Sequence, residues 1–224
     1  MLLGKGETFM TINRTRITLA LFVLAVYCAC VSPALGQPTP APRTRLPAVI
    51  KYDGDMAAML ANLTDIYGVT IGLEINPQQP RAQVGFDLRD PTLTDVLNAI
   101  TKSAPRYQWR QSGEFIEVLP QQDSSPLLET IVSSFRVTEV DGTEAFNQLL
   151  NLPDVQASMR AMRLNRRDLT NASARQSKSA KFSLSLEGIT MRQALNRIAN
   201  EDRARFWIFQ RDRNGYFSIS NTPR

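Results

Sequence analysis

The chain has 224 residues, with 26 Lys and Arg against 21 Asp and Glu, and it contains no histidine. The absence of histidine excludes His-based catalytic triads and His-ligated metal sites. The net charge of +5 is too small to indicate nucleic acid as the main partner. The length allows one large domain or two small ones.

Residues 1–36 have the pattern of a secretory signal peptide. The segment combines a basic end (Lys5, Arg14, Arg16), an apolar run (17–31) and a small-residue cleavage site ending at Gly36. Translation could begin at Met1 or at Met10, and the second start would give a signal peptide of more usual length. We therefore expect a chain exported to the periplasm, with an uncleaved anchor as the alternative.

Both cysteines, Cys28 and Cys30, lie inside this predicted signal peptide. Its removal would leave a mature chain with a net charge of +3 and no cysteine. Such a chain has no disulfide framework and no thiol nucleophile, which suits a bacterial periplasm. Lipid attachment at Cys30 is an alternative that would tie the chain to a membrane; Ala29 fits a lipoprotein signal, but Tyr27 and Cys28 fit it poorly.

A Pro-rich linker at 37–46 precedes a first predicted domain at 47–120. Alternating and 3.6-residue apolar patterns predict the order β-α-β-β-α-β-β. Within this domain, residues 82–110 predict a strand, a helix and a second strand. Thr92 and Asp95 form a capping-box pattern at the helix start, and an apolar stripe follows on Leu93, Val96, Leu97 and Ile100.

This stretch occurs twice in the chain, 98 residues apart and without a gap. The matched residues are Leu88, Thr92, Leu97, Asn98, Ile100 and Trp109 with Leu186, Thr190, Leu195, Asn196, Ile198 and Trp207. The capping box reappears as Thr190 and Gln193. A repeat of this length indicates tandem small domains rather than a solenoid.

A linker at 121–126 separates the first copy from a second, divergent one at 127–221. The second copy is predicted to open with a strand at 131–140 and a helix after Asp141, with a weak strand candidate at 159–164. Residues 165–180 (NRRDLTNASARQSKSA) are polar and basic and predict a flexible insertion. A final hairpin turns at Asn214-Gly215. The predicted fold class is α+β: two tandem modules, each a small sheet with two helices on one face.

The segments VGFDLRDPTLTDVLNAI and FSLSLEGITMRQALNRI, each leading to an aromatic strand and hairpin, resemble the secretin and TonB short N-terminal domain. The resemblance covers the first copy over almost its whole length and the second from Lys181 onward. It implies a non-enzymatic protein–protein interaction module of the bacterial envelope, at the outer membrane, in secretion, transport or signalling. The implied partners are envelope proteins, such as a secretin or a component of a TonB-dependent system, without nucleic acid and without a cofactor.

Chemical motifs are few. The sequence contains no Walker-type or dinucleotide-binding glycine loop. The acidic pairs Asp87 with Asp90 and Glu114 with Glu117 lie on strand and turn positions, which favours solvated carboxylates over glycosidase chemistry. Trp109 and Trp207 favour packing on the sheet over a ligand platform. We expect no enzymatic activity.

Two candidate contact sites remain. The first is a basic set for an acidic partner, a lipid head group or a cell-wall polymer: Arg160, Arg163, Arg166, Arg167, Arg175, Lys178 and Lys181. It supports the alternative function of a polyanion- or cell-wall-binding protein that uses the basic loop 160–181. The second is the outer edge of the last strand, at Phe217, Ser218, Ile219 and Ser220, where a partner could add a strand. The alternative for this hairpin is that it merely closes its own sheet.

Overall fold

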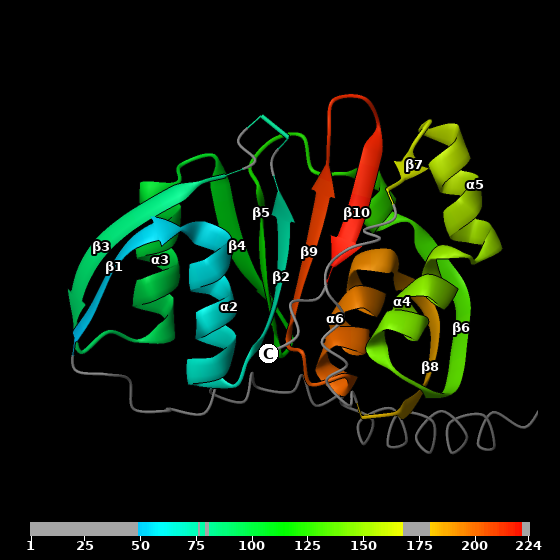
Figure 1. Cartoon of the computed structure of the whole chain (residues 1–224), viewed down its shortest axis with the longest axis horizontal. Coiled ribbons are helices and arrows are strands. Elements are labelled where there is room, and N and C mark those ends of the chain that lie inside the picture. The colour runs from blue at the N-terminus through cyan, green and yellow to red at the C-terminus, as the bar shows by residue number, and fades with distance from the viewer. Residues whose placement is uncertain (1–48, 76, 79–80, 168–179, 221–224) are drawn as a thin grey trace, which may run out of the picture. The chain divides into compact units, whose positions relative to one another are not determined.

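The computed structural model describes residues 49–75, 77–78, 81–167 and 180–220. Within these residues the fold is α+β, with five α-helices, one 3-10 helix and strands in three sheets (Figure 1). The predicted signal peptide and the whole Pro-rich linker at 37–46 lie outside the described residues, as do Arg175 and Lys178.

The first half of the described chain contains five strands and two helices, and two of the strands, β2 and β5, are buried along their whole length. Its elements are β1 (Val49–Asp55), α2 (Met56–Tyr67), β2 (Thr70–Ile75), β3 (Gln83–Arg89), α3 (Leu93–Ser103), β4 (Tyr107–Ser112) and β5 (Phe115–Pro120). Asp55 caps α2 by accepting a hydrogen bond from the Ala58 N–H, and Gly68 ends the helix in the left-handed region at φ 65°. Thr92 and Asp95 form a complete capping box at α3.

The second half has three α-helices, one more than the first, and a 3-10 helix. Its elements are η1 (Pro126–Glu129), β6 (Ile131–Val140), α4 (Gly142–Leu150), α5 (Pro153–Ala161), β7 (Asn165–Arg166), β8 (Phe182–Thr190), α6 (Met191–Glu201), β9 (Phe206–Arg211) and β10 (Tyr216–Ser220). Thr190 and Gln193 form the capping box of α6.

The strand predicted at 159–164 is wrong. Residues up to Ala161 belong to α5, which begins with Pro153 in its first turn and buries Val155 and Met159, four residues apart. The strand of this region is β7, which pairs in parallel with β10. The start of the predicted insertion is therefore a strand, while residues 168–179 lie outside the described part of the chain.

The prediction of a separate sheet in each half is also wrong. One six-stranded sheet, in the order β4-β5-β2-β9-β10-β7, takes strands from both halves. Its central join is a parallel pairing of β2 with β9, in which Ile71 to Ile75 lie opposite Phe206 to Gln210. Two antiparallel ribbons, β1-β3 and β6-β8, complete the fold.

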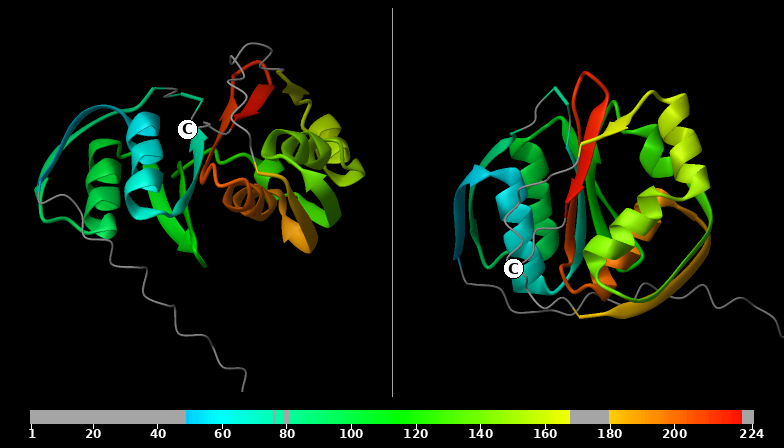
Figure 2. Two further views of the ribbon diagram at one scale, coloured as in Figure 1. Left: turned by 60° about the horizontal axis from the view of Figure 1, so that its bottom comes forward. Right: turned by 45° about the vertical axis from the view of Figure 1, so that its right-hand side comes forward.

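The shared sheet separates two hydrophobic cores (Figure 2). The helices α2 and α3 pack on one face, against alternate residues such as Ile71, Leu73 and Val118. The helices α4 and α6 pack on the opposite face, against Trp207, Phe209 and Phe217. The interior strands β2 and β5 are buried along their whole length because helices cover both faces of the sheet there.

Candidate functional site

The join between the two halves is built around Trp207 on β9. Its indole is fully buried and lies over Gly72 on the neighbouring strand β2, where a Cβ atom would overlap the indole carbons. The indole N–H donates to Asn196 Oδ1 on α6 at 2.7 Å. The corresponding bond in the first half runs from the Trp109 indole N–H on β4 to Asn98 Oδ1 on α3 at 2.9 Å. Each tryptophan is thus held by an asparagine of its own half.

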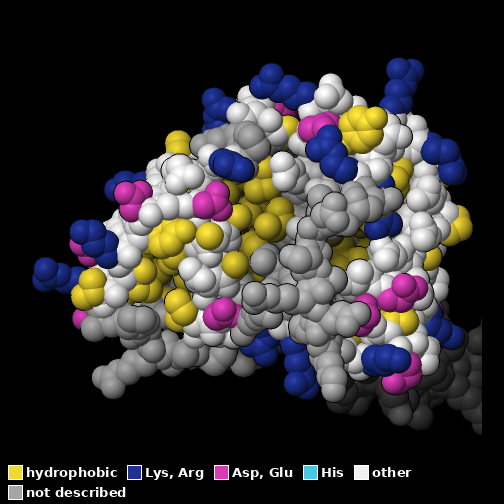
Figure 3. All heavy atoms as spheres, in the orientation of Figure 1, with side chains coloured by type: hydrophobic (Ala, Val, Ile, Leu, Met, Phe, Trp, Pro, Cys, Tyr) yellow, Lys and Arg dark blue, Asp and Glu magenta, His cyan; other side chains and the backbone are white. Residues whose placement is uncertain are grey.

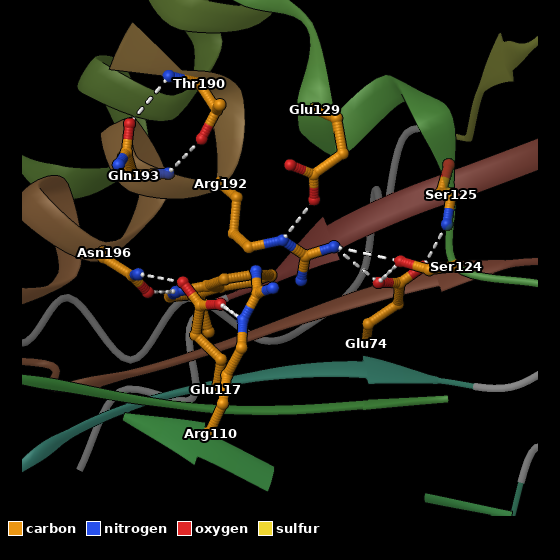
Figure 4. A network of polar contacts seen from close by, with 11 residues as sticks. Glu74, Arg110, Glu117, Ser124, Ser125, Glu129, Thr190, Arg192, Gln193 and Asn196 are labelled. Carbon is orange, nitrogen blue, oxygen red and sulfur yellow. Dashed lines mark hydrogen bonds and ion pairs between the residues drawn. The ribbon is translucent and has the colours of Figure 1, made fainter. Parts of the chain in front are cut away.

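Asn196 connects this tryptophan to the first half. Its amide group donates to Glu117 Oε1 on β5 at 2.9 Å, and the Arg110 Nε–H donates to Glu117 Oε2 at 2.7 Å (Figure 4). Glu117 is 1% exposed, so its charge is taken out of water. Both carboxylate oxygens are nevertheless hydrogen-bonded, which offsets the cost of burial.

A second buried carboxylate, Glu74 on β2, meets Arg192 on α6. The Arg192 guanidinium donates to Glu74 Oε2 at 2.7 Å and through Nε to Glu129 at 2.8 Å (Figure 4). Glu74 also accepts a bond at 2.8 Å from the Ser124 hydroxyl and one from the Ser125 N–H. The segment predicted as a linker at 121–126 therefore contributes two donors to this cluster.

Burial lowers the pKa of Arg192, but the charges and hydrogen bonds of Glu74 and Glu129 outweigh it and leave the pKa above its ordinary value. The arginine therefore stays charged inside the protein, and Glu74 is its buried counter-ion, each 2% exposed. This network joins the two halves, and its two buried carboxylates, Glu74 and Glu117, have a hydrogen-bond donor on each oxygen. Sequence reasoning did not find it, because Glu74 and Arg192 lie 118 residues apart.

The surface of the first half that corresponds to this join is exposed. In α6 the buried residues include Arg192, Asn196 and Ala199, whereas α3 buries only Val96, Leu97 and Ile100 among its residues. The positions of α3 that match Arg192 and Asn196 after the shift of 98 are Thr94 and Asn98, and both are exposed. Trp109 is only partly buried, in contrast to Trp207.

A hollow of about 310 Å³ lies on this exposed side of α3. It is lined by the end of β3, the loop that follows it and one face of α3: Leu88, Arg89, Pro91, Asp95, Asn98, Ala99 and Lys102. Asn98 links the hollow to β4 through its bond with Trp109. The hydrogen bonds from the hydroxyl and N–H of Thr92 hold the pKa of Asp95 below its usual range. The charged residues that line the hollow are Asp95, Arg89 and Lys102.

The predicted basic residues are exposed where the structure describes them. Arg160 lies in the last turn of α5, Arg163 follows this helix, and Lys181 precedes β8. Arg166 donates to Asn147 Oδ1 on α4 at 2.5 Å. Arg167 pairs with Asp212 at 2.9 Å and stacks over the ring of Tyr216 at 5.4 Å.

The structure adds two arginines that sequence reasoning missed. The Asn165 N–H donates to Gly215 O and the Arg167 N–H to Phe217 O, so β7 lies beside the β9–β10 turn. Arg211 on β9 and Arg166 on β7 both pair with Phe217, from opposite sides of β10, and Arg213 lies in the turn between β9 and β10. Figure 3 shows basic side chains along this part of the molecule. The sequence alone could not show that Arg211 and Arg213 lie near the arginines at 163–167, because this follows only from the pairing of β7 with β10.

The edge predicted for docking on β10 is partly occupied. Phe217 pairs with Arg166 on β7, and its side chain is 1% exposed and stacked on Phe209 at 5.7 Å between ring centroids. Ser218, Ile219 and Ser220 are paired with β9 on the other side. Trp207, Phe209 and Phe217 of this hairpin belong to the core of the second half, whereas Phe206 packs in the core of the first half and Tyr216 is exposed. The hairpin does not merely close its own sheet, because β9 also pairs with β2.

Among the described residues, no group of three or more Asp, Glu, His or Cys side chains is placed to hold a metal ion. No helix in the described ranges is both long and apolar enough to cross a membrane. No protein-family model matches the sequence, and no curated protein matches it.

Proposed function

We propose that this protein is a non-enzymatic interaction module of the bacterial envelope, exported by residues 1–36 and acting in the periplasm. In this proposal it consists of two copies of a small α/β module related to the secretin and TonB short N-terminal domain. The proposal is supported by features repeated 98 residues apart: the two capping boxes and the two Trp–Asn hydrogen bonds. The parallel pairings β2–β5 and β7–β10 are a further parallel between the halves.

One observation carries the functional part of the proposal: the two halves are bound to each other as two proteins would be. They share a sheet through edge strands, and buried polar groups cross the boundary at Glu74–Arg192 and Glu117–Asn196. Edge-strand pairing of this kind is a common mode of protein–protein recognition. A module that binds its neighbour through one edge is suited to bind a partner protein through another.

Affinity capture from the native envelope tests this function. The exported chain, carrying an affinity tag and chemically cross-linked in living cells, should recover a specific envelope protein. A bait with Arg160, Arg163, Arg166 and Arg167 changed to Ala is the matched control, because these exposed residues are distant in sequence from the β2–β9 join. Recovery of the same protein with both baits supports the adaptor function, and recovery of none with either bait contradicts it.

The arginine cluster supports a second candidate function, binding of an anionic polymer or membrane surface. It is favoured by the arrangement of Arg163, Arg166, Arg167, Arg211 and Arg213 around the β7–β10 pairing. Guanidinium groups bind phosphate and carboxylate groups well. Binding to heparin or to anionic vesicles that falls steeply with added salt, and that is lost in the four-alanine bait, would favour this function instead.

A further inference from the structure

The exposed edge of β4 corresponds to the edge of β9 that is already occupied inside the chain. The Gln121 N–H donates to Arg106 O, and alternation along an antiparallel pair then directs the backbone groups of Trp109 and Gln111 away from β5. On β9 the Ile71 N–H donates to Arg205 O, so Trp207 and Phe209 direct their backbone groups toward β2. After the shift of 98 residues these are the same positions.

The two edges differ in what covers them. The β9 edge carries β2 in parallel over five residue pairs, with α6 lying over it. The β4 edge has no strand beside it within the described residues, and the matching face of α3 is exposed next to the hollow at Asn98 and Ala99. The hydrogen bond from Trp109 to Asn98 nevertheless holds the indole as Trp207 is held. The exposed edge of β4 and the adjacent face of α3 thus form a surface like the one that β2 covers on β9 and α6, but without a covering strand.

We propose that β4 and the exposed face of α3 bind an edge strand of another protein's module, in parallel and in the register that β2 takes on β9. The inference rests on the proposed function and names the site and the kind of partner. The partner strand resembles β2, with a glycine opposite Trp109, because the Trp207 indole occupies the space of a side chain at Gly72. The partner strand and its sheet would cover the hollow as β2 and β5 cover α6.

The chain itself does not supply this strand well. In the second half the strand that pairs in parallel with β10, as β2 pairs with β5, is β7. Strand β7 has two paired residues, whereas β2 offers five to β9. A head-to-tail contact of this kind repeats along a filament or ring unless one edge is shortened. The short β7 favours a different protein as the occupant of β4 over a second copy.

A peptide with the sequence of residues 69–75 (VTIGLEI), flanked by lysines for solubility, serves as the probe for the full exported chain. The chain has two tryptophans, so its NMR spectrum contains two indole N–H signals. We expect the peptide to shift the signal of Trp109 and the amides of α3, and to leave Trp207 unchanged. A spin label on the peptide N-terminus should broaden residues near Tyr107, as a parallel register requires. A peptide with valine in place of the glycine should bind at least about tenfold more weakly.

Two variants test the site on the protein. Gln111→Pro removes an outward N–H without removing a bond to β5, and Gln111→Ala is its control with the N–H retained. Ala99→Arg fills the hollow from the exposed side of α3 and leaves the β4 backbone unchanged. Both Gln111→Pro and Ala99→Arg should weaken peptide binding at least about tenfold at an unchanged melting temperature. If Gln111→Pro alters folding, Ala99→Arg alone decides.

Three results would overturn the inference. The first is no shift of the Trp109 signal at up to about 1 mM peptide, and the second is that both variants bind the peptide as tightly as the wild-type chain. The third is a wild-type chain that self-associates and that dissociates when Gln111→Pro is introduced. The last result would make a second copy the occupant. Failure of the proposed function is a separate outcome. If the wild-type chain and Ala99→Arg capture the same envelope partner equally well, the proposed function stands and the site on β4 is wrong. If the peptide binds at β4 but no envelope partner is captured, the site stands and the proposed function is wrong.

Discussion

At Gly72 the backbone of β2 comes directly under the indole of Trp207, so the side chain at this position is limited to a hydrogen atom. Gly72→Ala places a methyl group in the volume of a rigid ring that is fully buried and held by Asn196. Overpacking of this kind costs about 1–3 kcal/mol. We expect that loss in the free energy of unfolding, measured in urea.

Gly85 on β3 is the matched control for this substitution. A Cβ atom there would meet nothing closer than Asp53 Oδ1 at 3.7 Å, and the residue is exposed. Gly85→Ala should change stability by less than about 0.5 kcal/mol. Equal losses in the two variants would mean that the contact between Gly72 and Trp207 does not limit the packing of the join.

The helices α3 and α6 begin with the same capping geometry but differ in one titrating group. The box of α3 uses Asp95, whose pKa is lowered first by the Thr92 hydroxyl and then by the Thr92 N–H. The box of α6 uses Gln193, which does not titrate. A carboxylate with a depressed pKa stabilises the folded state above its unfolded pKa of about 3.9. This stabilisation is lost as the pH falls through the lower, folded value.

Asp95→Gln gives α3 the box of α6 and removes this pH dependence. The wild-type chain should be more stable than the variant at pH 7, where the carboxylate also favours the helix N-terminus. The difference should shrink as the pH falls below about 4. Gln193→Ala is the control, and its effect on stability should stay constant over the same range. A difference between wild type and Asp95→Gln that does not change with pH would contradict the cause assigned here.

Elements with a cap and a long apolar stripe were predictable from the sequence. Both α3 and α6 lie at the predicted places, because each combines a capping box with apolar residues in a 3.6-residue pattern. The sequence does not predict the shorter α5, and the strand predicted at 159–164 overlaps its last three residues, since only Val155 and Met159 mark its buried face. The strand β7 falls at the start of the predicted flexible insertion, because its two polar residues carry no strand pattern.

The arrangement of the whole molecule could not be read from the sequence. Alternation in β2 identifies Ile71, Leu73 and Ile75 as one buried face, but Gly72 and Glu74 on the other face resemble a solvated side. Helix α6, more than a hundred residues later in the chain, covers that side. The pattern of a single strand contains no information on which distant helix will pack over it. The site inferred on β4 depends on this pairing and was missed for the same reason.

The buried pair of Arg192 and Glu74 decides how strongly the two halves depend on each other. Arg192→Met removes the cation and leaves Glu74 buried at 2% exposure with only the Ser124 and Ser125 donors. A buried charge without its partner costs about 3–5 kcal/mol. The double variant Glu74→Gln with Arg192→Met removes both charges and should recover most of that loss, since a neutral amide is much less costly to bury.

A second ion pair between the halves provides the control. Arg197, on the same helix, pairs with Glu114 at 2.7 Å, but the two side chains are 48% and 60% exposed. Arg197→Met should therefore cost less than about 1 kcal/mol.

Hydrogen exchange in each half supplies the readout for the whole molecule. The wild-type halves should exchange with one common free energy, because the shared sheet and the buried pair unfold together. In Arg192→Met the two halves should exchange with different free energies, the lower value belonging to the half that opens first. If the two halves of that variant still share one free energy of exchange, the sheet alone couples them.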